Sequence, residues 1–253
     1  MDVSDLLYGA YERKLVAQLP AERLPRHVAV MLDGNRRWAR ENGAKTADGH
    51  RAGADNIIPF LGWSQEVGIE LVTLWLLSTD NLKRDPDELA PLLRIIEDVV
   101  TEIAETGQWR VHPVGALDLL PAETRAKLEA AASATADVDG MIVNVAVGYG
   151  GRQEIADAVR NLLIEAKQAG QSIDDVIRTI DVEAITSHLY TRGQPDPDLV
   201  IRTSGEQRVG GFLLWQSTHS EFYFCEAYWP DFRRVDFLRA LRAFADHERR
   251  FGS

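Results

Sequence analysis

The sequence predicts an α/β protein with one open, mostly parallel sheet of six strands, flanked by helices, in a single domain over residues 1–253. Short apolar runs alternate along the chain with longer segments whose apolar residues recur at helical spacing. The run 71–77 is almost continuously apolar, which is typical of a strand buried on both faces of a parallel sheet. No long linker rich in Pro, Gly or Ser divides the chain, and no internal repeat is present, which favours one domain.

Local patterns predict the individual elements. An N-terminal helical arm over 1–24 contains a helix that ends at Pro20. Pro59 lies inside a helix expected over 51–67, where it removes a hydrogen bond, so we expect a bend there. The expected strands are 28–32, 71–77, 110–116, 141–147, 199–203 and 222–226, and the expected helices are 4–19, 51–67, 87–105, 121–136, 151–169, 173–190 and 233–249.

Composition excludes several classes of protein. The net charge is −11, from 28 basic and 39 acidic side chains, which disfavours nucleic acid as a partner. No apolar run approaches the roughly 18 residues of a membrane span, so no integral membrane segment is expected. Cys225 is the only cysteine, which excludes a disulfide within the chain and a cysteine-based metal site. We therefore expect a cytoplasmic protein.

Polar clusters follow four of the predicted strands, at the point where each strand ends. Because the carboxyl ends of parallel strands meet at one edge of a sheet, ligands of such folds gather there. Four clusters on the same side are more than turns alone require, and they predict a functional site. The clusters are 33–35, 78–81, 148–152 and 202–206.

The first cluster combines one carboxylate with several arginines. Asp33 ends an apolar strand, Gly34 tolerates a positive φ, and three arginines follow by position 40. The arginines suit a phosphate group, whereas Asp33 would repel one unless a cation lies between them. This pattern indicates a site for Mg²⁺ and a diphosphate. The alternative is a common Asp-Gly turn followed by a solvated helix start.

Taken together, these stretches resemble the cis-prenyltransferase (undecaprenyl diphosphate synthase-like) family, from about residue 25 to near the end of the chain. The similarity is closest to the actinobacterial short-chain (2Z,6E)-farnesyl diphosphate synthase branch, through 77–89 and 194–198. The segments that carry the family resemblance are 27–38, 49–53, 78–84, 144–152, 198–208 and 212–224.

The resemblance implies a Mg²⁺-dependent enzyme that adds isopentenyl diphosphate to an allylic prenyl diphosphate, for which geranyl diphosphate is the expected primer. Asp33 matches a metal ligand, and Glu221 matches a second one, from the same chain or a neighbouring subunit. Asn81 and His50 match positions near the reacting centre, although His50 could equally be structural. The allylic site matches Gly34, Asn35, Arg36, Arg37, the helix beginning near Trp38, and Arg84; the isopentenyl site matches Arg202, Arg208 and Gly210.

Three positions depart from the family pattern. Arg36 stands where the long-chain enzymes usually have Gly, so its side chain could crowd or bind a phosphate. Thr46 stands where an Arg for the allylic diphosphate is frequent. Gly210 replaces a common phosphate-binding Ser and leaves only a backbone amide. The metal carboxylates and the other arginines are kept, so we still expect activity.

Product length is expected to depend on an apolar tunnel between the helices 51–67 and 87–105 and the sheet. Leu76 matches a position that is small in long-chain members, which predicts a short product such as (2Z,6E)-farnesyl diphosphate. If Leu76 is instead ordinary strand core, a medium-chain or long-chain product remains open. By pattern, the tunnel lining is Ile57, Phe60, Leu61, Leu74, Leu76, Leu93, Ile96 and Val100.

Family resemblance also implies a homodimer. The apolar segment 212–224 and two tryptophans, Trp215 and Trp229, offer an interface. The tail Arg250-Phe251-Gly252 resembles one that reaches an active site across the dimer, or it simply complements a helix end. A membrane surface could be contacted through the product. A non-catalytic partner subunit and a different phosphate-handling enzyme are the competing interpretations.

Overall fold

The computed structural model describes the backbone of residues 3–251, with the side chains of 11–20 and 22–247. Its six strands form one sheet in the order β3-β4-β2-β1-β5-β6, and all five strand pairs are parallel. This confirms the predicted α/β class and strand number. The strands are β1 (His27–Met31), β2 (Leu71–Ser78), β3 (Arg110–Val114), β4 (Ile142–Tyr149), β5 (Leu199–Arg202) and β6 (Glu221–Phe224).

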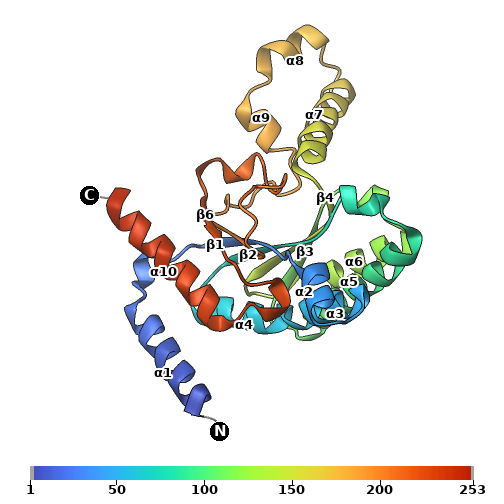
Figure 1. Ribbon diagram of the computed structural model, residues 1–253. Coiled ribbons are helices and arrows are strands. Elements are labelled where there is room, and N and C mark those ends of the chain that lie inside the picture. Colours follow the sequence, from blue (N-terminus) through green and yellow to red (C-terminus); the bar gives the residue numbers. More distant parts are fainter. Residues whose placement is uncertain (1–2, 252–253) are drawn as a thin grey trace.

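Helices cover both faces of the sheet. In Figure 1, α2 to α6 and α10 lie on one side, and α7 to α9 extend away on the other. No helix in the described part of the chain is long and apolar enough to cross a membrane. The helices are α1 (Val3–Gln18), α2 (Asn35–Glu41), α3 (Thr46–Asp55), α4 (Ile57–Glu66), α5 (Pro86–Glu105), α6 (Ala122–Ala134), α7 (Gly151–Gln168), α8 (Ile173–Thr179), α9 (Val182–Thr186) and α10 (Arg234–Phe251).

Strand β1 lies inside the sheet and is buried along its whole length. Its side chains alternate between two cores, because successive residues of a strand point to opposite faces. Val28 and Val30 belong to the larger core with α4, α5 and α10, whereas Ala29 and Met31 belong to a smaller core on the other face. The chain proceeds from β1 to β2 on one side and returns to β5 on the other, and this reversal leaves a crevice beyond the carboxyl ends of these strands.

The helix predicted over 51–67 is two helices, and the predicted bend at Pro59 is wrong. The break lies at Asn56, between α3 and α4, where the Asn56 side-chain amide donates to the carbonyls of Trp229 and Phe232 at 2.9 and 2.8 Å. Pro59 falls in the first turn of α4, where a helix has no internal partner for the missing N–H. Tertiary hydrogen bonds, rather than proline, therefore set the break.

Two other helix predictions need correction. The helix expected over 173–190 is replaced by the short α8 and α9, which begin at the capping residues Ser172 and Asp181. Helix α2 begins at Asn35, not near Trp38, because Gly34, three residues after the end of β1, turns the chain at φ 111. The Trp38 amide is therefore already used inside the helix, where it donates to the Gly34 carbonyl at 2.8 Å.

A buried histidine connects β1 to its neighbours. His27 lies within hydrogen-bond distance of the Pro195 carbonyl (2.9 Å, from Nδ1) and of Thr73 Oγ1 (2.8 Å, from Nε2). Asn144 Nδ2 also donates to Thr73 Oγ1, at 3.0 Å. Burial lowers the pKa of His27 to about 4, so the ring is neutral in the folded protein near pH 7.

We expect the free energy of unfolding to fall as the pH drops from 6.5 to about 4, because the unfolded His27 takes up a proton that the folded one resists. His27 would contribute a loss of about 3 kcal/mol by pH 4. Denaturant titrations of His27→Gln between pH 4 and 7 should show a shallower pH dependence than the wild type. The exposed-site variant His219→Gln should keep the wild-type slope, and equal slopes for His27→Gln and wild type would contradict the prediction.

Candidate active site

A cavity of about 580 Å³ opens beyond the carboxyl ends of β1, β2 and β5. Nearly all of its polar lining residues are exposed or partly exposed, whereas most of its apolar lining residues are buried, so its entrance is polar and its interior is apolar. The polar lining includes Asp33, Asn35, Arg36, Arg37, Arg40, His50, Ser78, Asn81, Arg84, Arg202, Glu206 and Arg208; the apolar lining includes Ala54, Ile57, Trp75, Leu76, Leu77, Leu92, Ile95, Ile96 and Val99.

Asp33 lies at the entrance between two arginines. Its Oδ2 accepts a hydrogen bond from Arg202 Nη2 at 2.8 Å, and its Oδ1 lies 3.6 Å from Arg37 Nη2. Burial alone would raise the pKa of Asp33, but the hydrogen bond and charge of Arg202, with the charge of Arg37, outweigh it and lower the pKa. The carboxylate is therefore ionised at neutral pH, as a metal ligand must be.

Besides Asp33, residues of the loop after β5 hold the Arg37 side chain in place. Ser204 adopts φ 80, a conformation that a residue other than glycine holds only with strain, and its Oγ accepts from Arg37 Nη2 at 2.6 Å. Glu206 Oε1 accepts from Arg37 Nη1 at 3.3 Å. The Arg37 guanidinium also lies over the Tyr228 ring, 5.5 Å from its centroid. Arg37 is thus held by contacts from several directions.

A second group of cations, from α2 and from the segment after β2, also lines the cavity. Arg84 donates to Asn81 Oδ1 and to Glu88 Oε1, both at 2.9 Å. Arg36 lies 3.7 Å from the same Glu88 carboxylate. Burial, and then the positive charge of Arg36, lower the pKa of Arg84. One carboxylate is therefore shared by two arginines, and this part of the entrance favours an anion.

His50 joins this group from α3. Close helix packing brings it there, because a Cβ on Gly49 would lie 2.3 Å from the Asn35 carbonyl and one on Gly53 would lie 2.4 Å from Asn35 Oδ1. Only glycine allows α3 to approach α2 this closely. Burial, followed by the charge of Arg84, lowers the pKa of His50 to about 4, so the imidazole is neutral near pH 7.

Unpartnered polar atoms gather in this cavity. Among the described residues, five buried side-chain atoms have no hydrogen-bond partner, and four of them belong to cavity residues. Buried polar atoms normally find partners, so such a concentration indicates a place where a ligand supplies them. The four atoms are Asn35 Oδ1, His50 Nε2, Trp75 Nε1 and Arg202 Nε.

Three of the positions considered for the diphosphate sites lie outside the cavity lining. Trp38 and Thr46 do not line the cavity, and Gly210 packs behind Arg202, where an added Cβ would lie 3.4 Å from Arg202 Nη1. Conversely, the sequence did not single out Glu206 or Trp75 as cavity residues. Glu206 lies within 198–208, one of the segments that carry the family resemblance, but no carboxylate besides Asp33 was expected among the arginines of the entrance.

Glu221 is not brought beside Asp33 within one chain. Glu221 pairs with Leu199 at the amino end of the sheet, and Leu199 pairs with Val28, five residues before Asp33. At about 3.3 Å per residue, the two carboxylates are separated by roughly 15 Å along the strands. The Glu221 carboxylate instead contacts His247, whose Nδ1 lies 2.6 Å from Glu221 Oε2.

The apolar lining differs from the one predicted. Ile57, Leu76 and Ile96 line the cavity, whereas Phe60, Leu61, Leu74 and Val100 are buried core and Leu93 lines a separate outer groove. On α5 the prediction chose the wrong face of the helix. The residues that line the cavity come one position earlier in the chain than Leu93 and Val100. The stripe of α5 that faces the cavity consists of Leu92, Ile95, Ile96 and Val99.

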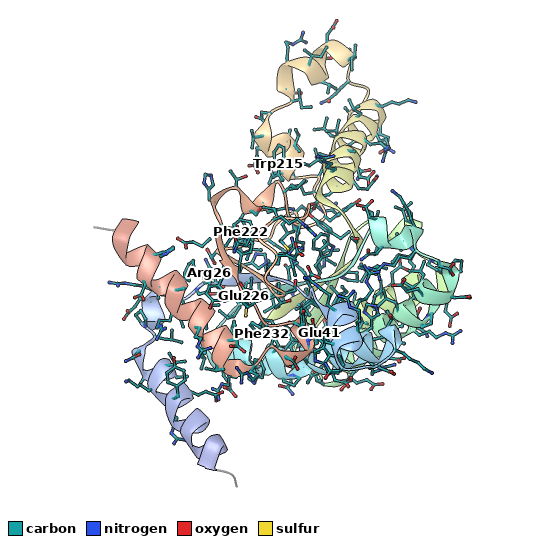
Figure 2. The ribbon with its side chains drawn as sticks, viewed as in Figure 1. Arg26, Glu41, Trp215, Phe222, Glu226 and Phe232 are labelled. Carbon is teal, nitrogen blue, oxygen red and sulfur yellow. The ribbon has the colours of Figure 1, made fainter. Side chains whose placement is uncertain are left out.

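The expected dimer segment also needs correction. Trp229 is completely buried: its ring packs edge-on against Phe60, at 5.6 Å between centroids, and its Nε1 donates to the Gly53 carbonyl at 2.6 Å. Trp229 therefore belongs to the core, not to an interface. Phe222 lies on the edge strand β6 (Figure 2). It stacks with Phe224, which is 36% exposed. Of the predicted tail, Gly252 lies outside the described residues, as do the side chains of the other two.

The residues at the entrance fit Mg²⁺ only together with a substrate. Within the described part of the chain, no three His, Cys, Asp or Glu side chains gather to hold a metal by themselves. Mg²⁺ commonly binds through one or two carboxylates plus diphosphate oxygens, and Asp33 supplies such a carboxylate among arginines that would hold the diphosphate. When bound, the metal would neutralise charge on a departing diphosphate.

Fold and site together define the class: an α/β protein with an anion-binding entrance leading to an apolar cavity. A protein-family model described as "Putative undecaprenyl diphosphate synthase" matches residues 31–252. The chain belongs to this undecaprenyl diphosphate synthase, or cis-prenyltransferase, family.

Individual relatives match over nearly the full length. The "(2Z,6E)-farnesyl diphosphate synthase" of Thermobifida fusca is 58% identical over 247 residues, which cover 97% of each chain. The "Short-chain Z-isoprenyl diphosphate synthase" of Mycobacterium leprae is 55% identical, covering 97% of this chain and 95% of that protein. Among solved structures, lavandulyl diphosphate synthase from Lavandula x intermedia, in complex with dimethylallyl diphosphate, is 33% identical with a TM-score of 0.82. It covers 88% of this chain and 96% of that one.

Proposed function

We propose that this chain is a Mg²⁺-dependent cis-prenyltransferase that condenses isopentenyl diphosphate with a short allylic diphosphate, with geranyl diphosphate as the expected primer. The product is a short Z-prenyl diphosphate such as (2Z,6E)-farnesyl diphosphate, and diphosphate is released. One observation carries the proposal: the same cavity has arginines and Asp33 at its entrance and aliphatic side chains inside. This arrangement suits a molecule with an anionic head and an apolar chain.

The two substrates need separate anion sites because two diphosphates repel each other. In our proposal, Arg36, Arg37 and Arg84 bind the allylic diphosphate, and Gly34 and Asn35 lie against it. Arg202 and Arg208 bind isopentenyl diphosphate, since a guanidinium stays charged and binds phosphate through two donors. Preorganised donors of this kind stabilise the charge that develops as the allylic diphosphate leaves.

The proton lost from isopentenyl diphosphate needs an acceptor. His50 is neutral, lines the cavity and has a buried Nε2 without a hydrogen-bond partner, so we propose it as a group that binds a diphosphate oxygen or relays this proton. Asn81 also lines the cavity, where its Oδ1 accepts a hydrogen bond from Arg84 at 2.9 Å, and it is proposed to orient the reacting groups.

We further propose a homodimer in which Glu221 of one chain completes the metal site of the other. Its position at the opposite end of the sheet from Asp33 is consistent with this arrangement. The exposed apolar surface of the chain supports an interface with a second copy. This surface includes Phe224 on β6 and a group on α7 to α9 formed by Leu163, Ile164, Ile173, Ile177, Ile180 and Val182.

A cytoplasmic location is part of the proposal, supported by the acidic net charge and the buried free thiol of Cys225.

A direct assay tests the proposed function and its metal dependence. Purified protein with Mg²⁺, labelled isopentenyl diphosphate and dimethylallyl, geranyl or farnesyl diphosphate should give a labelled product, to be sized after dephosphorylation. Excess chelator should lower turnover by at least about 100-fold, and added Mg²⁺ should restore it. Full turnover in chelator would contradict the metal site. Products of many isoprene units would instead favour a medium-chain or long-chain synthase, and no product would favour a non-catalytic partner subunit.

A further inference from the structure

A carboxylate lies among the arginines of the entrance, where it should repel an anionic substrate. Glu206 Oε1 accepts a hydrogen bond from Arg37 Nη1 at 3.3 Å, while its Oε2 lies 2.9 Å from Arg208 Nη1. Each oxygen of one carboxylate therefore binds a different arginine. The Glu206 and Arg37 side chains are 31% and 33% exposed, so solvent screens their ion pair incompletely, whereas Arg208 is 69% exposed and its pair is screened more.

The two arginines belong to different substrate sites under the proposed function, on which this inference rests. Arg37 serves the allylic diphosphate and Arg208 serves isopentenyl diphosphate. Asp33 also contacts an arginine from each site, but Asp33 is assigned to the metal. Charges of alternating sign thus run across the entrance of the cavity in the order Arg208, Glu206, Arg37, Asp33, Arg202.

We propose that Glu206 couples the binding of the two diphosphates. In the substrate-free protein it offsets part of the positive charge of Arg37 and Arg208 and holds both side chains near their binding positions. A diphosphate that binds either arginine competes with this carboxylate and repels it. Because both oxygens move with one carboxylate group, displacement from one arginine also releases the other.

The coupling arises because only the diphosphate that binds first must break the ion pairs of Glu206. The first diphosphate breaks both ion pairs of Glu206, and the second finds its arginine already free. A ligand that removes a conformational penalty for another ligand increases the affinity of that ligand, and the effect is reciprocal. Each substrate should therefore bind more tightly when the other is present, which favours the complex that holds both.

Binding measurements test this coupling without turnover. The dissociation constant of isopentenyl diphosphate is measured in Mg²⁺ with and without saturating geranyl S-thiolodiphosphate, an allylic analogue whose bridging sulfur resists ionisation. In the wild type, the analogue should tighten isopentenyl diphosphate binding about five-fold. In Glu206→Gln the ratio should be close to one, and isopentenyl diphosphate alone should bind more tightly than to the wild type.

Glu88→Gln is the matched control, because Glu88 contacts two arginines, Arg84 at 2.9 Å and Arg36 at 3.7 Å, that both belong to the allylic site. This variant should change the affinity for the analogue and keep the wild-type ratio. A wild-type ratio in Glu206→Gln, or a ratio of one in the wild type, would overturn the inference. A lower kcat in Glu206→Gln with an unchanged ratio would also overturn it and place Glu206 in the chemical step. The proposed function itself fails only if the wild type makes no prenyl product.

Discussion

Asp33→Asn is expected to lower kcat by on the order of 10²- to 10³-fold while the protein remains folded. Asparagine keeps the shape of the side chain and loses the negative charge on which a magnesium site depends. Its amide also cannot balance Arg202, whose side chain is only 7% exposed and whose Nη2 lies 2.8 Å from Asp33 Oδ2. Steady-state turnover at several Mg²⁺ concentrations measures the loss, and circular dichroism checks the fold.

Asp98→Asn makes the same chemical change outside the cavity. Asp98 pairs with Arg51 at 2.8 Å on the surface, where both side chains are about half exposed, and such pairs contribute little to stability. This variant should keep turnover close to that of the wild type. If Asp33→Asn retained more than about a tenth of wild-type turnover, a loss far smaller than removal of a preorganised charge produces, Asp33 would not be the metal carboxylate.

Leu76→Ala is expected to lengthen the product by one or more isoprene units. Leu76 lines the cavity from β2, opposite the aliphatic residues of α3, α4 and α5, so its shortening opens space where a growing chain would otherwise collide. The variant should lose less stability than the roughly 2–5 kcal/mol of a fully buried leucine, because Leu76 is only partly buried. Reversed-phase chromatography of the dephosphorylated products measures the change in length.

Leu93→Ala provides a matched control on α5. Leu93 was expected from the sequence to line the same tunnel, but it faces the separate outer groove. Its truncation should leave product length unchanged. An unchanged product for Leu76→Ala, or equal lengthening by both variants, would show that the end of the product is determined elsewhere in the cavity.

Local patterns predicted the sheet well because a buried strand is specified by its own residues. The apolar runs 28–32 and 71–77 became β1 and β2 within one residue of the expected bounds. Helices α3 and α4 were harder to predict, because their break depends on hydrogen bonds from Asn56 to carbonyls at Trp229 and Phe232, more than 170 residues away. A local sequence pattern cannot predict a hydrogen-bond partner so far away in the chain.

The lining of the cavity was only partly predictable. Several stripes of apolar residues on α5 have helical spacing, and the sequence does not say which stripe faces the sheet and which faces the cavity. Leu93 and Val100 were expected in the lining, whereas Leu92 and Val99 occupy it. A shift of one residue rotates the exposed face by about 100°, so small packing differences decide the outcome.

The sequence by itself determined the six strands, their mostly parallel arrangement and the edge at which polar residues gather, because strand periodicity and the polar ends of strands are local properties. Only the tertiary structure decided which charges meet. Asp33 and Arg202 are 169 residues apart, and so are Arg37 and Glu206. Each pair forms because β1 and β5 lie side by side, and Coulomb energy depends on distance in space and on burial, neither of which can be read along the chain.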